Sequence, residues 1–216
     1  MPRTKEQNEE IRARRKEAIM RGALSVYVEK GYAAADIGDV AERAGVARGL
    51  VYYYYKDKLS LFRDLFLHMF DLSNNHIRTH FGQEGSAVEL CQQFANAMFN
   101  NLFEQSDHVL FFFRMRHDLR ELFGKEEIKG LLWRDTKLQV MVEKLKMGMD
   151  AGEVRRMSPE LLTDQFWGAM MHGMAHLRQR NDELLKQGHS LEEVKELLET
   201  EIRDAALSCA LMLRPV

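Results

Sequence analysis

Four consecutive tyrosines, Tyr52 to Tyr55, follow Arg48 and precede Lys58. An arginine can hold the O6 and N7 atoms of guanine through two parallel hydrogen bonds, and tyrosine hydroxyls or a lysine ammonium can hold phosphate oxygens. Lys58 also falls in the first turn of the helix expected after Asp57, where free backbone N–H groups attract a phosphate. These residue types suit a nucleic acid, provided that one element presents them together.

A helix at about 100° per residue divides the tyrosines between two faces. The outer face carries Arg48, Gly49, Tyr52 and Tyr53, with Leu50 at its boundary. The inner face carries Ala47, Val51, Tyr54 and Tyr55, with Tyr54 near its edge. We expect the inner face to join the core and the outer face to enter a groove of DNA. The alternative is that Tyr52 and Tyr53 only pack against the first helix.

The segment DIGDVAERAGVARGLVYYYY predicts two short helices joined by a turn. Asp36 is suited to N-cap the first of these helices. The carboxylate of Asp39, three residues later, interacts favourably with the positive N-terminal end of the helix dipole. Gly45 fits the turn, where the backbone often takes a positive φ, and Ala41 is small enough for two helices to touch. This spacing predicts a helix-turn-helix, although it also fits a helical hairpin that does not bind DNA.

The rest of the chain also has helical periodicity, and no strand-like alternation is found. Gly31 is suited to end a first helix over 9–30. Ser158 followed by Pro159, and Ser190 with Glu193, are typical helix starts. Beyond the helix that Asp57 begins, we expect helices over 87–104, 107–123, 126–151, 158–186 and 190–213. The expected fold class is all-α, with about nine helices.

Composition limits the cellular setting and the partners. The two cysteines show no C-x-x-C spacing, which excludes a zinc finger and fits a reduced, cytoplasmic compartment. We expect no signal peptide and no membrane span, since the charged start lacks an apolar segment and no long apolar run exists. The first 60 residues are mildly basic and the remainder is acidic. This charge distribution favours an anionic partner for residues 1–60.

The matching positions of a known family are Ala23-Leu24, Tyr27, EKGY at 29–32, Ile37, VAERAGV at 40–46, Gly49, Tyr52, Tyr55, KDK at 56–58 and Leu61-Phe62. On these residues, 18–62 resemble the N-terminal DNA-binding domain of the TetR family of bacterial transcriptional regulators. The resemblance implies a helix-turn-helix domain over 1–60 and a helical ligand-binding and dimerisation domain over 61–216. It also implies a homodimer on a palindromic double-stranded operator, usually a repressor that a small molecule releases.

By that resemblance, the positions that face DNA are Gly38, Ala47, Arg48, Gly49, Leu50, Tyr52, Tyr53 and Lys58. The sequence departs from the family in two respects. Alanine stands at 35 and 47, near which a hydroxyl residue is usual, and Tyr55 replaces a phenylalanine. Ala47 removes one phosphate contact, and the Tyr55 hydroxyl needs a partner near the core or access to water.

The basic run RARRK, from Arg12 to Lys16, precedes the core of the first helix. It could place arginines along phosphates or in a minor groove. It also fits a solvated helix start, because Glu9, Glu10 and Glu17 are interleaved with it.

Large, soft side chains in the second part of the chain predict a pocket between helices for an apolar or amphipathic effector. The candidate lining residues are Phe94, Met98, Phe112, Met115, Trp133, Met141, Phe166 and Met170. The alternative for each is a place in an ordinary core. Arg114, Arg116 and His117 lie in an otherwise apolar helix, where one of them could orient an acidic ligand or could instead form a salt bridge to a neighbouring helix.

The last two expected helices carry apolar stripes, and the resemblance implies that they form the dimer interface. Gly168 and Gly173 would allow a partner helix to approach closely. The pairs His172/His176 and His76/His80 have a spacing that can bind zinc, but no H-E-x-x-H or nucleotide-binding motif occurs. We therefore expect no enzyme activity, cofactor or metal. The alternative is a helical small-molecule- or metal-binding protein without specific DNA recognition.

Overall fold

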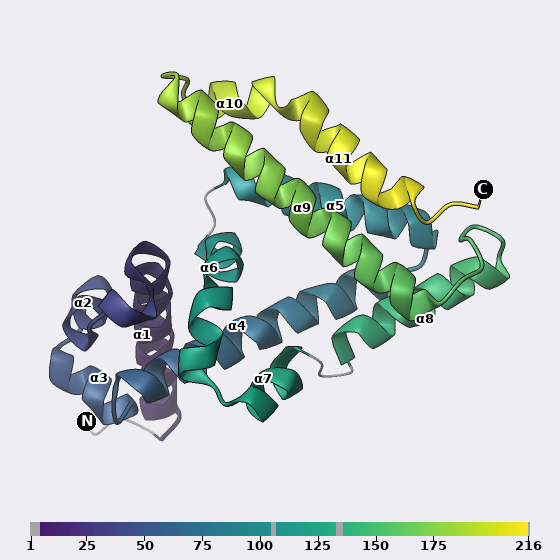
Figure 1. Cartoon of the computed structure of the whole chain (residues 1–216). Helices are drawn as coiled ribbons and strands as arrows, with labels where there is room; N and C mark the ends of the chain where they lie inside the picture. The colour runs from purple at the N-terminus through teal and green to yellow at the C-terminus, as the bar shows by residue number, and fades with distance from the viewer. Residues whose placement is uncertain (1–4, 105–106, 133–135, 216) are drawn as a thin grey trace. The chain divides into compact units, whose positions relative to one another are not determined.

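The computed structural model describes residues 5–104, 107–132 and 136–215. All regular secondary structure in these ranges is helical (Figure 1), which confirms the all-α fold class. The helices are α1 Lys5–Ala34, α2 Ile37–Arg43, α3 Arg48–Tyr54, α4 Lys58–Phe81, α5 Ala87–Phe103, α6 Asp107–Leu122, α7 Lys125–Leu132, α8 Thr136–Asp150, α9 Pro159–Lys186, α10 Leu191–Leu197 and α11 Glu199–Leu211. None of them is both long and apolar enough to cross a membrane.

Two of the expected helices are each divided in the structure. The segment 126–151 forms α7 and α8, and residues 133–135 between them lie outside the described ranges. The segment 190–213 forms α10 and α11, which meet at Leu198. Leu198 has φ −96° and ψ 0° and is fully buried. The packing of its side chain stabilises this break in the helix, which the spacing of apolar residues in the sequence does not predict. The described part of the chain therefore has more helices than the nine expected.

Local capping chemistry places the helix starts where the sequence predicts them. Asp36 caps α2 in a capping box with Asp39, and Ser190 caps α10 in one with Glu193. Ser158 accepts a hydrogen bond from the backbone of Leu161, with Pro159 at the first helical position. Each cap satisfies backbone N–H groups that the first turn of a helix leaves free.

The helices group into two compact units. Unit 1 contains residues 1–71 and 107–133, and unit 2 contains residues 72–106 and 134–216. These units do not coincide with the division expected at residue 60, because α6 and α7 belong with the N-terminal helices and the boundary falls within α4. The assignment of DNA binding to 1–60 and of ligand binding and dimerisation to 61–216 stays a prediction.

An aromatic core holds unit 1 together around Tyr27 of α1. Its ring lies 5.1 Å from the ring of Phe66 and 5.3 Å from that of Phe111, and all three side chains are fully buried. The Tyr27 hydroxyl donates to Asp118 Oδ2 at 2.6 Å, which joins α1 to α6. Burial, and then this hydrogen bond, raises the pKa of Tyr27 and keeps it neutral.

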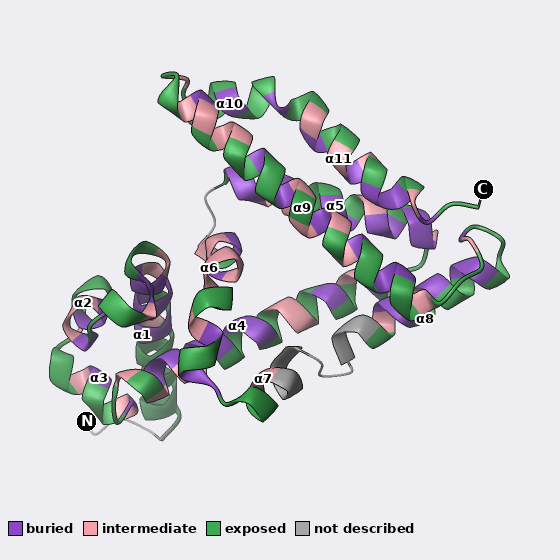
Figure 2. Cartoon of the chain, viewed as in Figure 1, coloured by how far each residue is buried: buried purple, intermediate pink, exposed green. Residues whose placement is uncertain are grey.

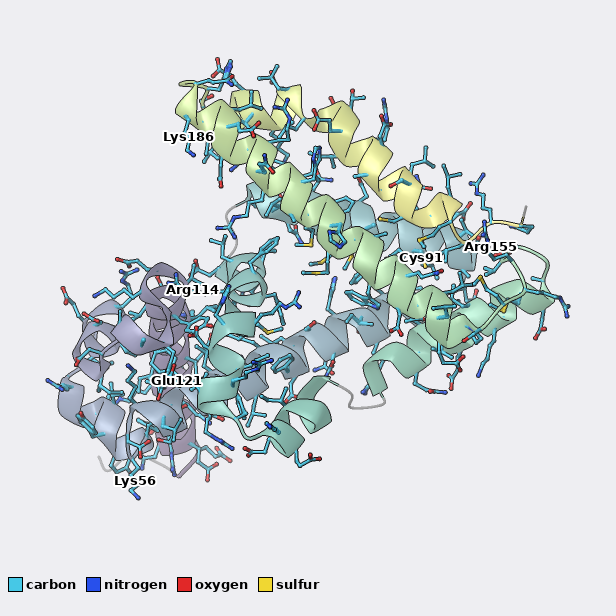
Figure 3. All side chains as sticks on the ribbon, viewed as in Figure 1. Lys56, Cys91, Arg114, Glu121, Arg155 and Lys186 are labelled. Atoms are coloured by element: carbon cyan, nitrogen blue, oxygen red, sulfur yellow. The ribbon has the colours of Figure 1, made fainter. Side chains whose placement is uncertain are left out.

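Arg114 makes a second polar link between α6 and α1 (Figure 3). Its Nη1 donates to the carbonyl oxygen of Val28 at 2.8 Å, just before Gly31 interrupts α1 with φ 77° and ψ 173°. Carbonyl groups near such a break lack helical partners, and the guanidinium supplies one. The sequence leaves open whether Arg114 orients a ligand or forms a salt bridge to a neighbouring helix. In the structure Arg114 bonds the neighbouring helix α1 through backbone carbonyl oxygens, not through a carboxylate.

Unit 2 is built around α5, which packs against α9 and α11. Phe99 of α5 is fully buried, and a Cβ atom at Gly173 of α9 would lie 2.8 Å from its ring. Gly173 therefore lets α9 approach α5 of the same chain closely, and its expected contact with a partner helix stays a prediction. Cys91 and Cys209 are buried free thiols, and burial raises the pKa of Cys91 to about 12.

Candidate nucleic-acid interface

The inner side of α3 anchors it to the core of unit 1. Val51 is fully buried and Tyr55 is 6% exposed, as the helical wheel predicts. The Tyr55 hydroxyl donates to Asp64 Oδ2 at 2.8 Å, which supplies the partner that this departure from the family requires. Burial, and then this bond, raises the pKa of Tyr55, so the hydroxyl keeps the proton that it donates.

The outer side of α3 is open. Tyr52 is 46% exposed and Tyr53 is 71% exposed, and Arg48 and Gly49 are also exposed (Figure 2). A Cβ atom added at Gly49 would meet no other atom within 4 Å, so nothing in the chain covers this point of the helix. The structure thus brings four of the predicted DNA-facing residues together on one face, and it does not support the alternative that the two tyrosines pack on the first helix.

Arg48, the first residue of α3, has two neighbours on this face. Its guanidinium carbon lies 5.8 Å from the ring centre of Tyr52, and Nη2 lies 4.0 Å from Asp36 Oδ1. The interaction with Tyr52, followed by the charge of Asp36, raises the pKa of Arg48. A weak ion pair at this distance leaves the guanidinium donors available while limiting their direction.

Gly38 lies beside the same group. Its backbone N–H donates to Asp36 Oδ1, and a Cβ atom at Gly38 would lie 2.8 Å from that oxygen and 4.0 Å from Arg48 Nη1. Gly38 is thus half-buried under the cap of α2 and close to the outer face of α3. A larger residue here would push the Asp36 carboxylate away from its capping position.

Lys58 is half-buried at the first position of α4. Its ammonium donates to the carbonyl oxygen of Ala33 at 3.0 Å and lies 4.5 Å from the ring centre of Tyr32. An ammonium has three donors, so two remain after the bond to Ala33. The predicted phosphate contact of Lys58 is compatible with this geometry and stays a prediction.

The remaining candidates lie at the margins of the face. Ala47 is exposed although the wheel places it inward, because it precedes α3 with an extended backbone (φ −67°, ψ 141°) and helical periodicity does not apply to it. Leu50 and Tyr54 are half-buried. The Tyr54 hydroxyl lies 3.4 Å from the carbonyl oxygen of Arg12.

Sequence reasoning missed two acidic partners of this interface. Asp36 was expected only as a helix cap, yet it also lies next to Arg48. Asp64 was not singled out, although it accepts from Tyr55 and pairs with Lys16 Nζ at 3.1 Å. The sequence indicates only that Asp64 lies about two turns into α4. The turn at Lys56 and Asp57 then directs the Asp64 side chain toward the end of α3.

The predicted pocket residues lie in both units. Phe94, Met98, Met141, Phe166 and Met170 belong to unit 2, where all but the half-buried Met98 are buried. Phe112 and Met115 belong to unit 1 and pack against its core. Trp133 lies outside the described residues. The predicted lining of an effector site by this set stays a prediction.

One histidine of each pair has another polar partner. His80 Nε2 lies 2.7 Å from the carbonyl oxygen of Leu90, and His176 Nε2 lies 3.2 Å from Glu201 Oε2. Within the described ranges, no group of three or more His, Cys, Asp or Glu side chains is arranged to hold a metal ion.

Residues 19–65, which contain the whole α2–α3 face, match the family model of bacterial regulatory proteins of the tetR family. The regulator AcrR of Shigella flexneri is 33% identical over 75 residues, which are 35% of this chain and 31% of AcrR. The repressor BepR of Brucella suis is 37% identical over 65 residues, or 30% of this chain and 29% of BepR. The chain belongs to the TetR family.

The likeness of this TetR-family chain to its curated relatives covers about a third of their length. Solved structures extend the likeness of the fold to nearly all of the chain. A TetR-family regulator from Marinobacter aquaeolei VT8 has a TM-score of 0.70 at 18% identity and covers 96% of this chain and 100% of its own. FadR from Bacillus subtilis, solved in complex with stearoyl-CoA, has a TM-score of 0.65 at 20% identity and covers 89% and 98%.

Proposed function

We propose that this TetR-family chain is a sequence-specific DNA-binding transcriptional regulator, and that it represses its target until a small apolar or amphipathic ligand releases it from its operator. The exposed α3 face of Arg48, Gly49, Tyr52 and Tyr53 carries the proposal. An arginine that shares a helix face with two tyrosines fits the major groove, because the arginine can read guanine while the hydroxyls reach phosphates. Gly49 lets the helix backbone approach the bases.

The anchoring of α3 supports this function. Val51 and the bond between Tyr55 and Asp64 fix the rotation of the helix about its axis, so its outer side chains keep one direction. Binding sites that are organised before the partner arrives lose less conformational entropy on association.

A homodimer through the last helices would present two copies of α3 to a palindromic operator. Unit 2 leaves apolar side chains exposed on these helices: Leu161 at 47%, Leu197 at 55% and Leu211 at 47%. Gly168 of α9 is exposed, and a Cβ atom there would meet no other atom within 4 Å. In sedimentation experiments, the Leu211→Glu variant should contain more monomer and less dimer than the wild type. A variant that dimerises as the wild type does would show that Leu211 is not part of the interface.

An aromatic cluster in unit 2 supports the ligand part of the proposal. The ring of Phe94 lies 5.6 Å from that of Trp167 and 5.2 Å from that of His80. The indole Nε1 of Trp167 is buried, and among the described residues it has no hydrogen-bond partner. A buried donor without a partner is costly, so a ligand with an acceptor group beside an apolar body would be favoured here.

DNA recognition is tested by selection from a random duplex pool at low salt. The expected result is a palindromic consensus whose affinity falls steeply with salt, because phosphate contacts release counterions. If the purified protein selects no consensus, the chain is instead a helical small-molecule- or metal-binding protein without specific DNA recognition.

Ligand binding is tested with Trp167 as the probe. The chain has two tryptophans, so Trp133→Phe leaves Trp167 as the single emitter. Fatty acids, acyl thioesters and neutral amphiphiles form the screening set, since a protein of the same fold holds stearoyl-CoA. A ligand of the proposed class should change Trp167 emission and release the protein from its selected duplex. Release without any emission change would place the ligand site elsewhere.

A further inference from the structure

The first turns of α1 and the edge of α3 form a common groove. It has a volume of about 520 Å³ and is lined by Asn8, Glu9, Ile11, Arg12, Arg15, Leu50, Tyr53 and Tyr54. Tyr53, which is 71% exposed on the outer α3 face, forms part of its wall. The groove is therefore continuous with the candidate DNA-binding face and extends it along α1.

The four basic side chains of the run RARRK divide by their partners. Arg14 pairs with Glu10 at 2.6 Å, and Lys16 pairs with Asp64 at 3.1 Å. Arg12 and Arg15 are exposed on the groove, and within the described part of the chain neither forms an ion pair. Positions three apart lie on one side of a helix, so both arginines point along the same strip of α1.

We propose that Arg12 and Arg15 form a second DNA contact, which holds the phosphates of the strand that borders the major groove entered by α3. This contact rests on the proposed function, because its partner is the duplex that α3 reads. Two arginines without an ion-pair partner lie beside Tyr53 and give the groove an excess of positive charge, which a phosphate backbone requires. The contact adds affinity and fixes the register of α3, but it carries no base preference.

Glu9 is the opposing charge in the same groove. A second groove also borders the start of α1, and Glu9 and Arg12 line both grooves. The exposed carboxylate of Glu9 therefore lies between them. A carboxylate near a phosphate is unfavourable, so Glu9 should weaken the contact that the arginines make. Removing the charge of Glu9 should tighten DNA binding, whereas removing the arginines should weaken it, so Glu9 provides a second test of the proposal.

The experiment compares two double variants that remove the same charge. Arg12→Gln with Arg15→Gln removes the proposed contacts. Arg14→Gln with Arg21→Gln is the control, because both arginines are exposed and already paired with a glutamate one turn earlier, Arg14 with Glu10 and Arg21 with Glu17. Affinity for the selected duplex and for a random duplex is measured over a range of salt concentrations, and thermal unfolding checks that each variant is folded.

The first double variant should flatten the plot of log affinity against log salt by about 0.9 for each lost phosphate contact, or about 1.8 for each bound protomer. It should weaken binding to both duplexes by a similar factor and leave the selected consensus unchanged. The control should keep the wild-type slope. Glu9→Gln should tighten binding, whereas Glu17→Gln, whose carboxylate is paired with Arg21, should have a smaller effect.

Equal slopes in the two double variants would show only a general effect of net charge and would overturn the contact. A change in the consensus, with an unchanged slope, would also overturn it, since bases rather than phosphates would then be read. If the wild-type protein selects no consensus, the proposed function itself fails, and that result is visible before any variant is made.

Discussion

The hydroxyl of Tyr55 lies 2.8 Å from Oδ2 of Asp64, and this hydrogen bond joins the end of α3 to α4. It lies on the opposite side of α3 from Arg48, Tyr52 and Tyr53. The polar contact behind the helix therefore sets the direction of the residues in front of it. The same carboxylate pairs with Lys16, so α1 is included in this arrangement.

Substitution of Tyr55 should lower stability in two steps. Tyr55→Phe removes the hydrogen bond, and Asp64 keeps Lys16 as a partner, so the free energy of unfolding should fall by about 1 kcal/mol. Tyr55→Ala also removes a buried ring, and the loss should be about 3–5 kcal/mol. Chemical denaturation measures both. Equal losses in the two variants would mean that the ring contributes nothing beyond its hydroxyl.

Tyr52→Phe should weaken DNA binding roughly 10-fold and leave the unfolding temperature unchanged, because an exposed hydroxyl that reaches a phosphate is lost. Tyr55→Phe is the matched control, since its hydroxyl lies on the opposite side of α3 and bonds Asp64, so its loss should leave DNA affinity unchanged. Fluorescence anisotropy with the selected duplex measures both affinities. Wild-type binding by Tyr52→Phe would remove its hydroxyl from the interface.

Arg48→Ala should relax the selected consensus at one base pair, with a loss of roughly 10- to 100-fold in the preference for guanine there. Arg48→Lys should recover charge but not the paired hydrogen bonds, so it should restore part of the affinity without the preference. Repeating the duplex selection with each variant provides the measurement. An unchanged consensus in Arg48→Ala would exclude Arg48 as a base reader.

Gly31→Ala should destabilise unit 1 more than Gly45→Ala. Gly31 has φ 77° and ψ 173°, a region that residues with a Cβ atom adopt at a cost of about 1–3 kcal/mol, and its Cβ would lie 2.8 Å from Arg114 Nε. Gly45 also has a positive φ, of 66°, but a Cβ there meets no other atom within 4 Å. Urea unfolding of both variants separates backbone strain from the displacement of Arg114, and equal losses would show that Arg114 moves aside freely.

Acid should weaken the contact between α1 and α2. Lys30 holds the pKa of Asp39 below its ordinary value of 3.8 through a hydrogen bond, and it lies 2.9 Å from the carboxylate. The pKa is lowered in the folded state, so this contribution to stability is present above pH 3.8 and is lost as the pH falls through the lower folded value. Unfolding midpoints at pH 5 and pH 3 should differ less in Asp39→Asn and in Lys30→Met than in the wild type.

The local features of the fold could be predicted because their causes act over a few residues. A carboxylate or hydroxyl satisfies N–H groups two or three positions later, so Asp36, Ser158 and Ser190 mark helix starts in the sequence itself. The two faces of α3 follow from its period alone, and only Ala47, which precedes the helix, departs from them.

The sequence by itself determined that the chain is helical, that α2 and α3 form a helix-turn-helix, and which side chains of α3 face outward. The tertiary structure decided which distant groups meet: Tyr55 with Asp64, Arg114 with the end of the first part of α1, and Gly173 with Phe99. It also decided that Arg12 and Arg15 border α3 while Arg14 and Lys16 are paired. Helical periodicity determines the direction in which a side chain points from its own helix. Its partner depends on how separate helices pack against one another, and this packing is determined by all the buried side chains of the core together.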